Sequence, residues 1–477
     1  MRGASTPTSP QFFRDHDEAR SASPPATNPR QALEMGLMSR ARESIVGRLA
    51  QALITNRLAN APPEFFIAVA CSRWPPSETR SNCIRAAAKA PVDWERFLGI
   101  VERHRIWGLA RQGLTQAGVA LPAEIDRALN AKTWAVSRRN LAHAAETARL
   151  CWLFREAAIP AVFVKGVTLS VLAYGDIAIK HSRDIDILVS PARVLEARAV
   201  LERAGYALKY PLPALTETQL ALLLRHGKEW EFLREVGELT TELHWTLTFN
   251  GSLMRDVDVS SPLAGVRVGD AEIPTFRIEE LFVYLCAHGA AQHSWSRMKW
   301  LADVAALLAT IPSADIEALY RGAQRRGSGR CAAQALLLCE RMLGVELPAA
   351  LRAELRRTVT ALLLEAIALD AMLGRVVQPG VELSTRAFGI LRDLLSLFLL
   401  GGGSYVYVWR GVTRLFFFSE DVAAFALPRR LTWVYVILRV PLWALRRLKQ
   451  GMKVKSTGAM KYLSWASGAR KKQPWRE

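Results

Sequence analysis

The sequence predicts an α+β protein, and three observations support this fold class. Helical periodicity fills the chain from Ser39 to about Glu156. Short strand-like apolar runs then alternate with a helix between Ala161 and Leu247, and the helical period returns at Ile278 and continues to about Leu373. A region of strands between two helical regions is the arrangement expected of an α+β domain.

These changes of pattern divide the 477 residues into five predicted regions. A Ser- and Pro-rich start without periodicity predicts disorder. The predicted regions are a disordered segment (1–34), an N-terminal helical region (35–157), a sheet domain with the candidate site (158–277), a helical domain (278–385) and an apolar, basic C-terminal region (386–477).

Cysteine usage and the start of the chain indicate a cytoplasmic protein. The six cysteines form no CxxC pair and no metal-ligand spacing, which is typical of free thiols in a reducing compartment. The residues after Met1 lack the apolar core of a signal peptide, so export is not expected.

The net charge of +19 belongs mostly to the end of the chain. Thirteen Lys and Arg residues face only Glu477 between Arg429 and the C-terminus, a net +12 for this tail. Its partner could be an anionic membrane, contacted peripherally at the inner face, or a nucleic acid; a solvated end without a partner is the other alternative. The apolar runs 394–409 and 431–445 are shorter than the roughly 20 residues of a membrane span, so neither is predicted to cross.

Asp184 and Asp186 carry the sharpest chemical signal. They are separated by Ile185 and followed by the aliphatic run Ile187-Leu188-Val189. In a strand both aspartates share one face, with Cα atoms roughly 6.6 Å apart. Two carboxylates this close repel by about 4 kcal/mol at an effective dielectric of about 20. Mg²⁺ is the expected counter-charge. Two such ions are expected: one would activate an attacking oxygen, and the other would neutralise a triphosphate.

A third acid from a neighbouring strand could complete the metal site. Alternation in the run 238–247 puts Glu242 and His244 on one face. Glu242 is the candidate ligand, while Glu238 and Glu231 remain alternatives that only strand register separates. His244 could orient this acid, act as a general base or simply lie on the sheet face.

Several basic residues around the aspartates suit phosphate binding. Lys165-Gly166 lies at a strand-to-helix turn, where a glycine lets backbone N–H groups approach an anion and the lysine adds a full charge. It is not a Walker A loop, because the G-x-x-x-x-G-K-[ST] spacing is absent. Lys180, His181 and Arg183 could hold phosphates or balance the acids.

The segment after Ile278 offers a second set of candidates. On a continuous helix His288, Gln292, Trp295, Lys299 and Asp303 would form one stripe. The five-residue spacing of His288 and His293 argues against a zinc helix, which needs histidines at i and i+4. Lys299 and one histidine would therefore contact a triphosphate or hold the helical domain to the sheet.

The combination of these motifs, rather than any one of them, resembles a known family. The matching motifs are Val92-Asp93-Trp94, His104-Arg105, Lys165-Gly166, Tyr174-Gly175-Asp176, Lys180 to Val189, Ala204-Gly205-Tyr206, Glu242 to Trp245, His288-Gly289 to Asp303, and Leu427-Pro428 with Leu438-Arg439. Together they resemble the bacterial uncharacterised nucleotidyltransferase family, a branch of the polymerase-β-like superfamily. The resemblance covers roughly residues 60 to 450. This chain departs from the superfamily at two places. The superfamily usually has Gly-Ser or Gly-Gly where this chain has Lys165-Gly166-Val167, and an arginine is expected where this chain has Lys180.

The resemblance implies a small mixed β-sheet that carries the active site, flanked by helices. It implies Mg²⁺-dependent transfer of a nucleoside monophosphate from a nucleoside triphosphate, with Asp184 and Asp186 as the metal-binding pair; Mn²⁺ is the alternative ion. The expected acceptor is unidentified and not a nucleic acid, since the basic charge is not spread along the catalytic region. The alternative hypothesis is a catalytically inactive nucleotide-binding accessory protein of envelope or polysaccharide assembly.

Overall fold

A computed structural model describes residues 45–374 except positions 211, 213 and 238, and then 394–402, 404–416, 422, 426–431, 433–435 and 437–438. The predicted disordered segment 1–34 and the last part of the basic tail, 439–477, lie outside the described residues. From Gly47 onward the described chain belongs to one compact unit.

The centre of the fold is a five-stranded sheet in the order β1-β2-β5-β4-β3. The central strands β2 and β5 run parallel, whereas the other neighbouring pairs are antiparallel. The strands are β1 (Ala161–Phe163), β2 (Ile185–Val189), β3 (Ala207–Leu208), β4 (Glu229–Arg234) and β5 (Leu239–His244). The sheet is thus small and mixed, and helices occupy both ends of the chain, so the α+β prediction is confirmed.

Side-chain alternation in β2 gives the sheet two different faces. Ile185, Ile187 and Val189 pack in a buried cluster with Val200 of helix α8 (Val194–Arg203) and Phe154. Residues of opposite parity point to the other face, which puts the Asp186 side chain there. Burial of the three aliphatic residues on one side therefore fixes the aspartate on the other.

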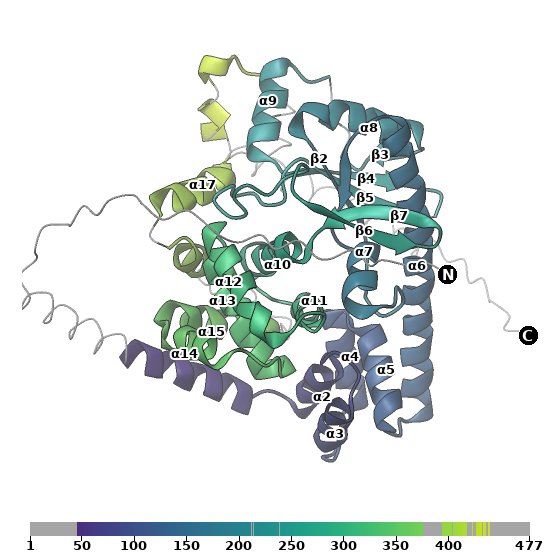
Figure 1. Cartoon of the computed structure of the whole chain (residues 1–477), viewed down its shortest axis with the longest axis vertical. Helices are drawn as coiled ribbons and strands as arrows, with labels where there is room; N and C mark the ends of the chain where they lie inside the picture. Colours follow the sequence, from purple (N-terminus) through teal and green to yellow (C-terminus); the bar gives the residue numbers. More distant parts are fainter. Residues whose placement is uncertain are drawn as a thin grey trace, which may run out of the picture. The chain divides into compact units, whose positions relative to one another are not determined.

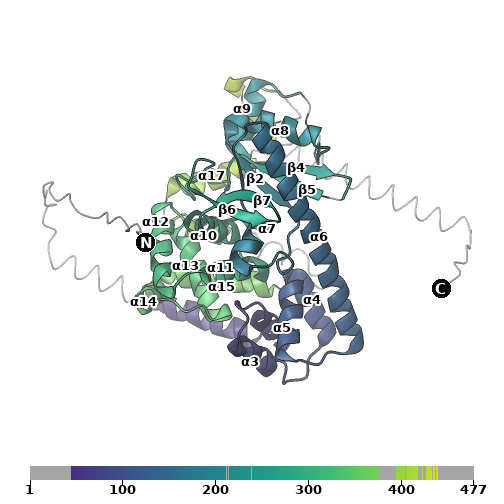
Figure 2. The same ribbon diagram turned by 45° about the vertical axis from the view of Figure 1, so that its right-hand side comes forward.

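A long helix, α6 (Ala123–Glu156), joins the N-terminal helices to this sheet. Its first half supplies Leu129 and Val136 to the helical core, and its second half supplies Leu150 and Phe154 to the cluster beneath the sheet. Figure 2 shows α6 running past α4 and α5 and on to the strands. The shorter N-terminal helices are α2 (Pro63–Cys71), α3 (Glu78–Ala87), α4 (Trp94–His104) and α5 (Trp107–Ala117), after a first helical segment over residues 45–59.

Between β5 and the second helical region lies a hairpin that the sequence patterns did not predict. β6 (Leu263–Val268) and β7 (Ala271–Phe276) form a separate two-stranded sheet. Gly269 at its turn has φ +61°, a conformation that favours glycine. Helix α9 (Glu217–His226), with a capping box at Thr216, also lay outside the predicted elements.

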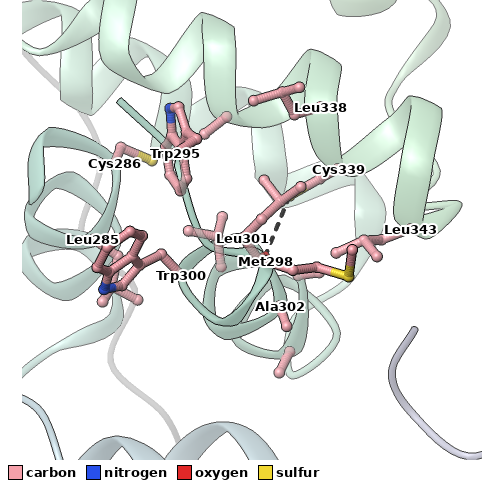
Figure 3. Packing of buried hydrophobic residues seen from close by; sticks show 14 of the residues in the cluster. Leu285, Cys286, Trp295, Met298, Trp300, Leu301, Ala302, Leu338, Cys339 and Leu343 are labelled. Atoms are coloured by element: carbon pink, nitrogen blue, oxygen red, sulfur yellow. Dashed lines mark hydrogen bonds between the residues drawn. The ribbon is translucent and has the colours of Figure 1, made fainter. Parts of the chain in front are cut away.

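The second helical region packs against the acid-bearing side of the sheet (Figure 1). Its helices are α10 (Ile278–Ala287), α11 (Met298–Leu308), α12 (Ile316–Arg325), α13 (Gly329–Leu338), α14 (Ala349–Arg357) and α15 (Val359–Leu373). Figure 3 shows the core between α10, α11 and α13, where Trp295, Leu301 and Cys339 are buried. The Cys339 thiol donates to the carbonyl of Leu301 across this core (3.8 Å).

The last long helix described is α17 (Tyr405–Phe416), preceded by a short helix over residues 394–400 and followed by a 3-10 turn (Arg429–Leu431). Within the described part of the chain, no helix is both long and apolar enough to cross a membrane. All six cysteines are free thiols, and five of them are buried.

Candidate functional site

Strand register brings two acids directly side by side. Asp186 of β2 and Glu242 of β5 are partners in the parallel pairing, and Glu242 is in turn the partner of Glu231 on β4. Glu231 lies one strand further from Asp186, and its carboxylate pairs with Lys209 at 2.5 Å. Of these two acids, Glu242 is the one beside Asp186; Glu238 lies outside the described residues.

His244 completes a compact group with these acids. Its Nε2 lies 3.1 Å from Asp186 Oδ1 and 3.3 Å from Glu242 Oε2, and its Nδ1 lies 3.1 Å from Glu229 Oε2. Burial and Lys228 lower the pKa of His244, but Glu229, Asp186 and Glu242 outweigh them, so the net pKa is raised. The imidazole therefore favours the protonated form, in which both ring nitrogens face carboxylates.

Lys165 supplies a second positive charge to Asp186. β1 ends at Phe163, and the turn through Gly166 (φ +63°) brings Lys165 Nζ to 2.8 Å from Asp186 Oδ1. Burial raises the pKa of Asp186, but Lys165 and His244 together hold it well below its usual range. Asp186 is therefore ionised, and the close partner of Lys165 is this carboxylate rather than a phosphate.

The group of Asp186, Glu242 and His244 fits a divalent ion. Each residue offers one ligand atom, and the three atoms lie within 4.8 Å of one another. The second carboxylate oxygen of Asp186, Oδ2, is buried and accepts no hydrogen bond from the described residues. A buried carboxylate oxygen without a donor is costly, and a cation would satisfy it. Two oxygen donors and one imidazole nitrogen suit Mn²⁺ as well as Mg²⁺.

A cavity of about 330 Å³ opens beside this group. That volume is at the lower end of small-molecule sites. It lies between the sheet and the second helical region, because its lining comes from both. The lining residues are Arg105, Lys165, Gly166, Lys180, Ser182, Asp184, Lys228, Glu229, Glu242, Phe249, Leu285, His288, Gln292, His293, Arg297, Lys299, Trp300 and Asp303.

Some of the cations that line the cavity have a carboxylate partner. Lys180 Nζ lies 3.5 Å from Asp303 Oδ2, while Asp303 Oδ1 accepts a hydrogen bond from Tyr174 (3.0 Å). Lys228 contacts its neighbour Glu229.

Three other lining cations, Arg105, Arg297 and Lys299, have no carboxylate within 4.0 Å among the described residues. Burial and the nearby Lys180 lower the pKa of Lys299 to about 7. Burial, Arg297 and Arg183 lower the pKa of Arg105 to about 10. Both values reflect burial first and neighbouring positive charges second, and a bound polyanion would offset both effects.

Two of these three cations, Arg105 and Arg297, reach the cavity from irregular backbone, whereas Lys299 lies in the first turn of α11. Arg105 ends α4 in the left-handed conformation (φ 55°), which is uncommon for a residue other than glycine. The preceding residue, His104, accepts a hydrogen bond through Nδ1 from the backbone N–H of Met298 at the start of α11 (3.0 Å). This bond joins the turn that carries Arg105 to the helix that carries Lys299.

The continuous helix considered for the segment after Ile278 is wrong. The chain leaves the helix at His288, passes through a π-turn (His288–Gln292) and enters α11 only at Met298. Ser294 and Trp295 both have positive φ (47° and 52°), and the backbone N–H of Trp295 donates to the carbonyl of Gly289 (2.9 Å). The Trp295 ring fills the space beside Gly289, where a Cβ atom would come within 2.3 Å of it. Burial of this tryptophan therefore breaks the helix.

The two histidines of this segment form an aromatic cluster. His293 stacks on Trp300 with ring centroids 4.0 Å apart, and His288 meets His293 edge-on at 4.5 Å. Burial and Lys165 lower the pKa of His293 to about 3 and that of His288 well below its usual range, so both rings are neutral. They form part of one wall of the cavity.

The structure brings most of the predicted residues to one cavity. Asp184, Glu242, His288 and the phosphate candidates Lys165, Gly166, Lys180 and Lys299 all line it, and Asp186 lies behind Lys165. Arg183 is exposed and does not line the cavity. Asp184, half-buried one residue before β2, is not in the compact group with Asp186. Sequence reasoning named no role for Arg105, Ser182, Lys228, Glu229, Phe249, Arg297 or Trp300.

Comparison with known proteins identifies the family. The profile of a family described as uncharacterised nucleotidyltransferase matches residues 90–344, which include α4 with Arg105, the whole sheet, and α11 with Lys299. No curated protein matches the chain. Since the match spans more than half of the 477 residues, the protein belongs to this family of uncharacterised nucleotidyltransferases.

Proposed function

We propose that the protein transfers a nucleoside monophosphate from a nucleoside triphosphate to an acceptor other than a nucleic acid, releasing pyrophosphate in a reaction that depends on a divalent ion. The observation that carries the proposal is the register pairing of Asp186 with Glu242 beside a cavity whose cations Arg105, Arg297 and Lys299 lack acidic partners. This chemistry has two requirements: acids that hold a metal ion, and cations beside them that hold the phosphates.

Asp186, Glu242 and Asp184 are the proposed metal ligands. Oδ2 of Asp186 has no hydrogen-bond donor, and Asp184 and Glu242 line the cavity. Bound there, Mg²⁺ or Mn²⁺ would neutralise the triphosphate and activate the attacking oxygen. His244 touches both Asp186 and Glu242, so its proposed role is to orient these carboxylates. Its raised pKa makes it a poor general base in this state.

The phosphate-binding residues are proposed to be Lys299, Arg105 and Arg297, with Gly166 at the turn after β1. These three cations line the cavity and have no carboxylate of their own. A triphosphate would place negative charge where like charges now repel. Lys165 and Lys180 pair with Asp186 and Asp303, so they act mainly by setting the positions of these acids.

Paired carboxamide variants on adjacent strands test this proposal. Purified protein, a divalent ion and each nucleoside triphosphate labelled at the α-phosphate would be incubated with a lysate that supplies acceptors. Asp186→Asn and Glu242→Gln should abolish transfer of label. Glu231→Gln is the matched control, because Glu231 is the register partner of Glu242 but pairs with Lys209. Full activity of Glu242→Gln, or loss of activity in Glu231→Gln alone, would contradict the assignment.

One observation favours the alternative of a nucleotide-binding accessory protein without catalysis. Lys165 Nζ and His244 Nε2 lie 2.8 Å and 3.1 Å from Asp186 Oδ1, so groups of the protein itself can balance this acid. The same assay separates the two functions. Saturable binding of a nucleoside triphosphate without pyrophosphate release, with every acceptor tested, would select the accessory role.

A further inference from the structure

The helices near the C-terminus have an anchored side and a bare side. Tyr407 of α17 is buried, and its carbonyl accepts a hydrogen bond from the Asn250 side chain (2.9 Å). The turn over residues 394–400 is held in the same way, since Leu400 is buried and Arg330 donates to the carbonyl of Leu399 (2.5 Å). Both helices are therefore fixed to the body of the protein.

Their outer side exposes large apolar side chains. Tyr405 and Trp409, one helical turn apart on α17, are 82% and 66% exposed, and Phe398 of the neighbouring turn is 57% exposed. A Cβ atom on Gly411 of α17 would lie 2.9 Å from Leu397, so the two helices touch. These residues, with the partly exposed Leu394 and Leu395, define a C-terminal apolar surface. Large apolar side chains that stay exposed on two packed and anchored helices mark a candidate contact site.

The charge that accompanies this surface is positive. From Arg429 onward the sequence carries thirteen Lys and Arg residues against the single acid Glu477. Trp433 and Ile437, again one helical turn apart, are also exposed (58% and 61%) at the start of this basic stretch. Aromatic side chains combined with a local excess of cations match the chemistry of an anionic bilayer interface, where rings enter the headgroup region and cations pair with lipid phosphates.

We propose that the C-terminal apolar surface docks the protein on an anionic membrane surface, with Tyr405, Trp409 and Phe398 entering the interface and the net +12 charge of the sequence from Arg429 onward favouring anionic lipids. The protein lies on the membrane in this arrangement, and no described helix is suited to span it. A second copy of the chain fits less well, because two such tails would repel. A nucleic acid would leave the aliphatic part of the surface, Leu394 and Leu395, unused. The inference does not depend on the proposed transfer activity.

Flotation of the full-length protein with vesicles tests the proposal. Phosphatidylcholine vesicles would be compared with vesicles that also contain phosphatidylglycerol, at low and high salt. The wild type should float with the anionic vesicles and detach as salt rises. The double variant Tyr405→Ser/Trp409→Ser should lose about tenfold or more of the bound fraction, because it removes two interfacial rings but no charge.

The matched control is Trp134→Ser/Trp152→Ser. These tryptophans are also largely exposed (66% and 58%), as Tyr405 and Trp409 are, but they lie on α6, outside the C-terminal apolar surface. This control should float like the wild type, and unchanged circular dichroism should verify that both double variants are folded. Three outcomes would overturn the proposal: no flotation of the wild type with anionic vesicles, equal flotation of Tyr405→Ser/Trp409→Ser, or concentration-dependent dimers that this double variant abolishes.

Discussion

Raising the pH from about 7 to about 9 is expected to weaken binding of a nucleoside triphosphate, because Lys299 must carry a proton to attract phosphate oxygens. Burial and Lys180 lower the pKa of Lys299 to about 7 in the free protein. A bound triphosphate supplies the missing negative charge and should return the pKa towards its ordinary value of about 10.4. Binding and protonation of this lysine are therefore coupled.

The magnitude follows from the fraction of protonated Lys299 before binding. With a pKa of about 7 this fraction is about one half at pH 7 and about one hundredth at pH 9, so Kd should rise about fiftyfold. Near pH 8 each bound nucleotide should take up about 0.9 proton from the buffer. Three other groups that could meet at the nucleotide keep their charge in this window. Triphosphate oxygens are ionised above about pH 6, His293 is neutral with a pKa of about 3, and Arg105 stays protonated with a pKa of about 10.

Isothermal titration calorimetry at fixed divalent-ion concentration would measure both quantities, using two buffers with different ionisation enthalpies to count protons. Lys299→Met is the control variant, and it should bind weakly with little dependence on pH. An affinity of the wild type that stays constant over this range, or an equal pH slope in Lys299→Met, would refute the reasoning. Either result would mean that Lys299 does not face the phosphates.

Two further predictions concern the packing and the ion. Gly289→Ala should destabilise the protein by about 1–3 kcal/mol in thermal or denaturant unfolding, because its Cβ would lie 2.3 Å from Trp295. Gly99→Ala on α4 is its control, since nothing lies within 4 Å of that Cβ, and it should be neutral or stabilising; equal effects would contradict the packing argument. Chelation by EDTA should abolish transfer, and added Mg²⁺ or Mn²⁺ should restore it, because the proposed carboxylate ligands bind either ion. His244→Asn should raise the ion concentration needed for half-maximal transfer, because His244 orients two of these carboxylates, whereas an unchanged concentration would contradict that role.

The sheet and its acids could be predicted because their signals are local. Strand alternation needs only neighbouring residues, so Ile185, Ile187 and Val189 already implied that Asp186 points the opposite way. The choice of Glu242 over Glu231 needed the register between strands far apart in the chain, which no local pattern contains. The roles of these acids and the domain boundaries at 157, 277 and 385 remain predictions.

The cations of the cavity were harder to predict because their positions depend on breaks in regular structure. Arg105 reaches the cavity from a left-handed helix end, and Arg297 from the loop that Trp295 forces out of the helical path. The sequence around Trp295 predicts a helix, because its local pattern does not reveal that the indole N–H donates to Gln334 of α13 and that the ring packs on Gly289. Positive φ at Ser294 and Trp295 costs backbone energy that this packing must offset. Asp186 and Glu242 lie on regular strands, whereas Arg105 and Arg297 lie on irregular turns. A substitution that loosens one of these turns should therefore impair phosphate binding before it disturbs the metal site.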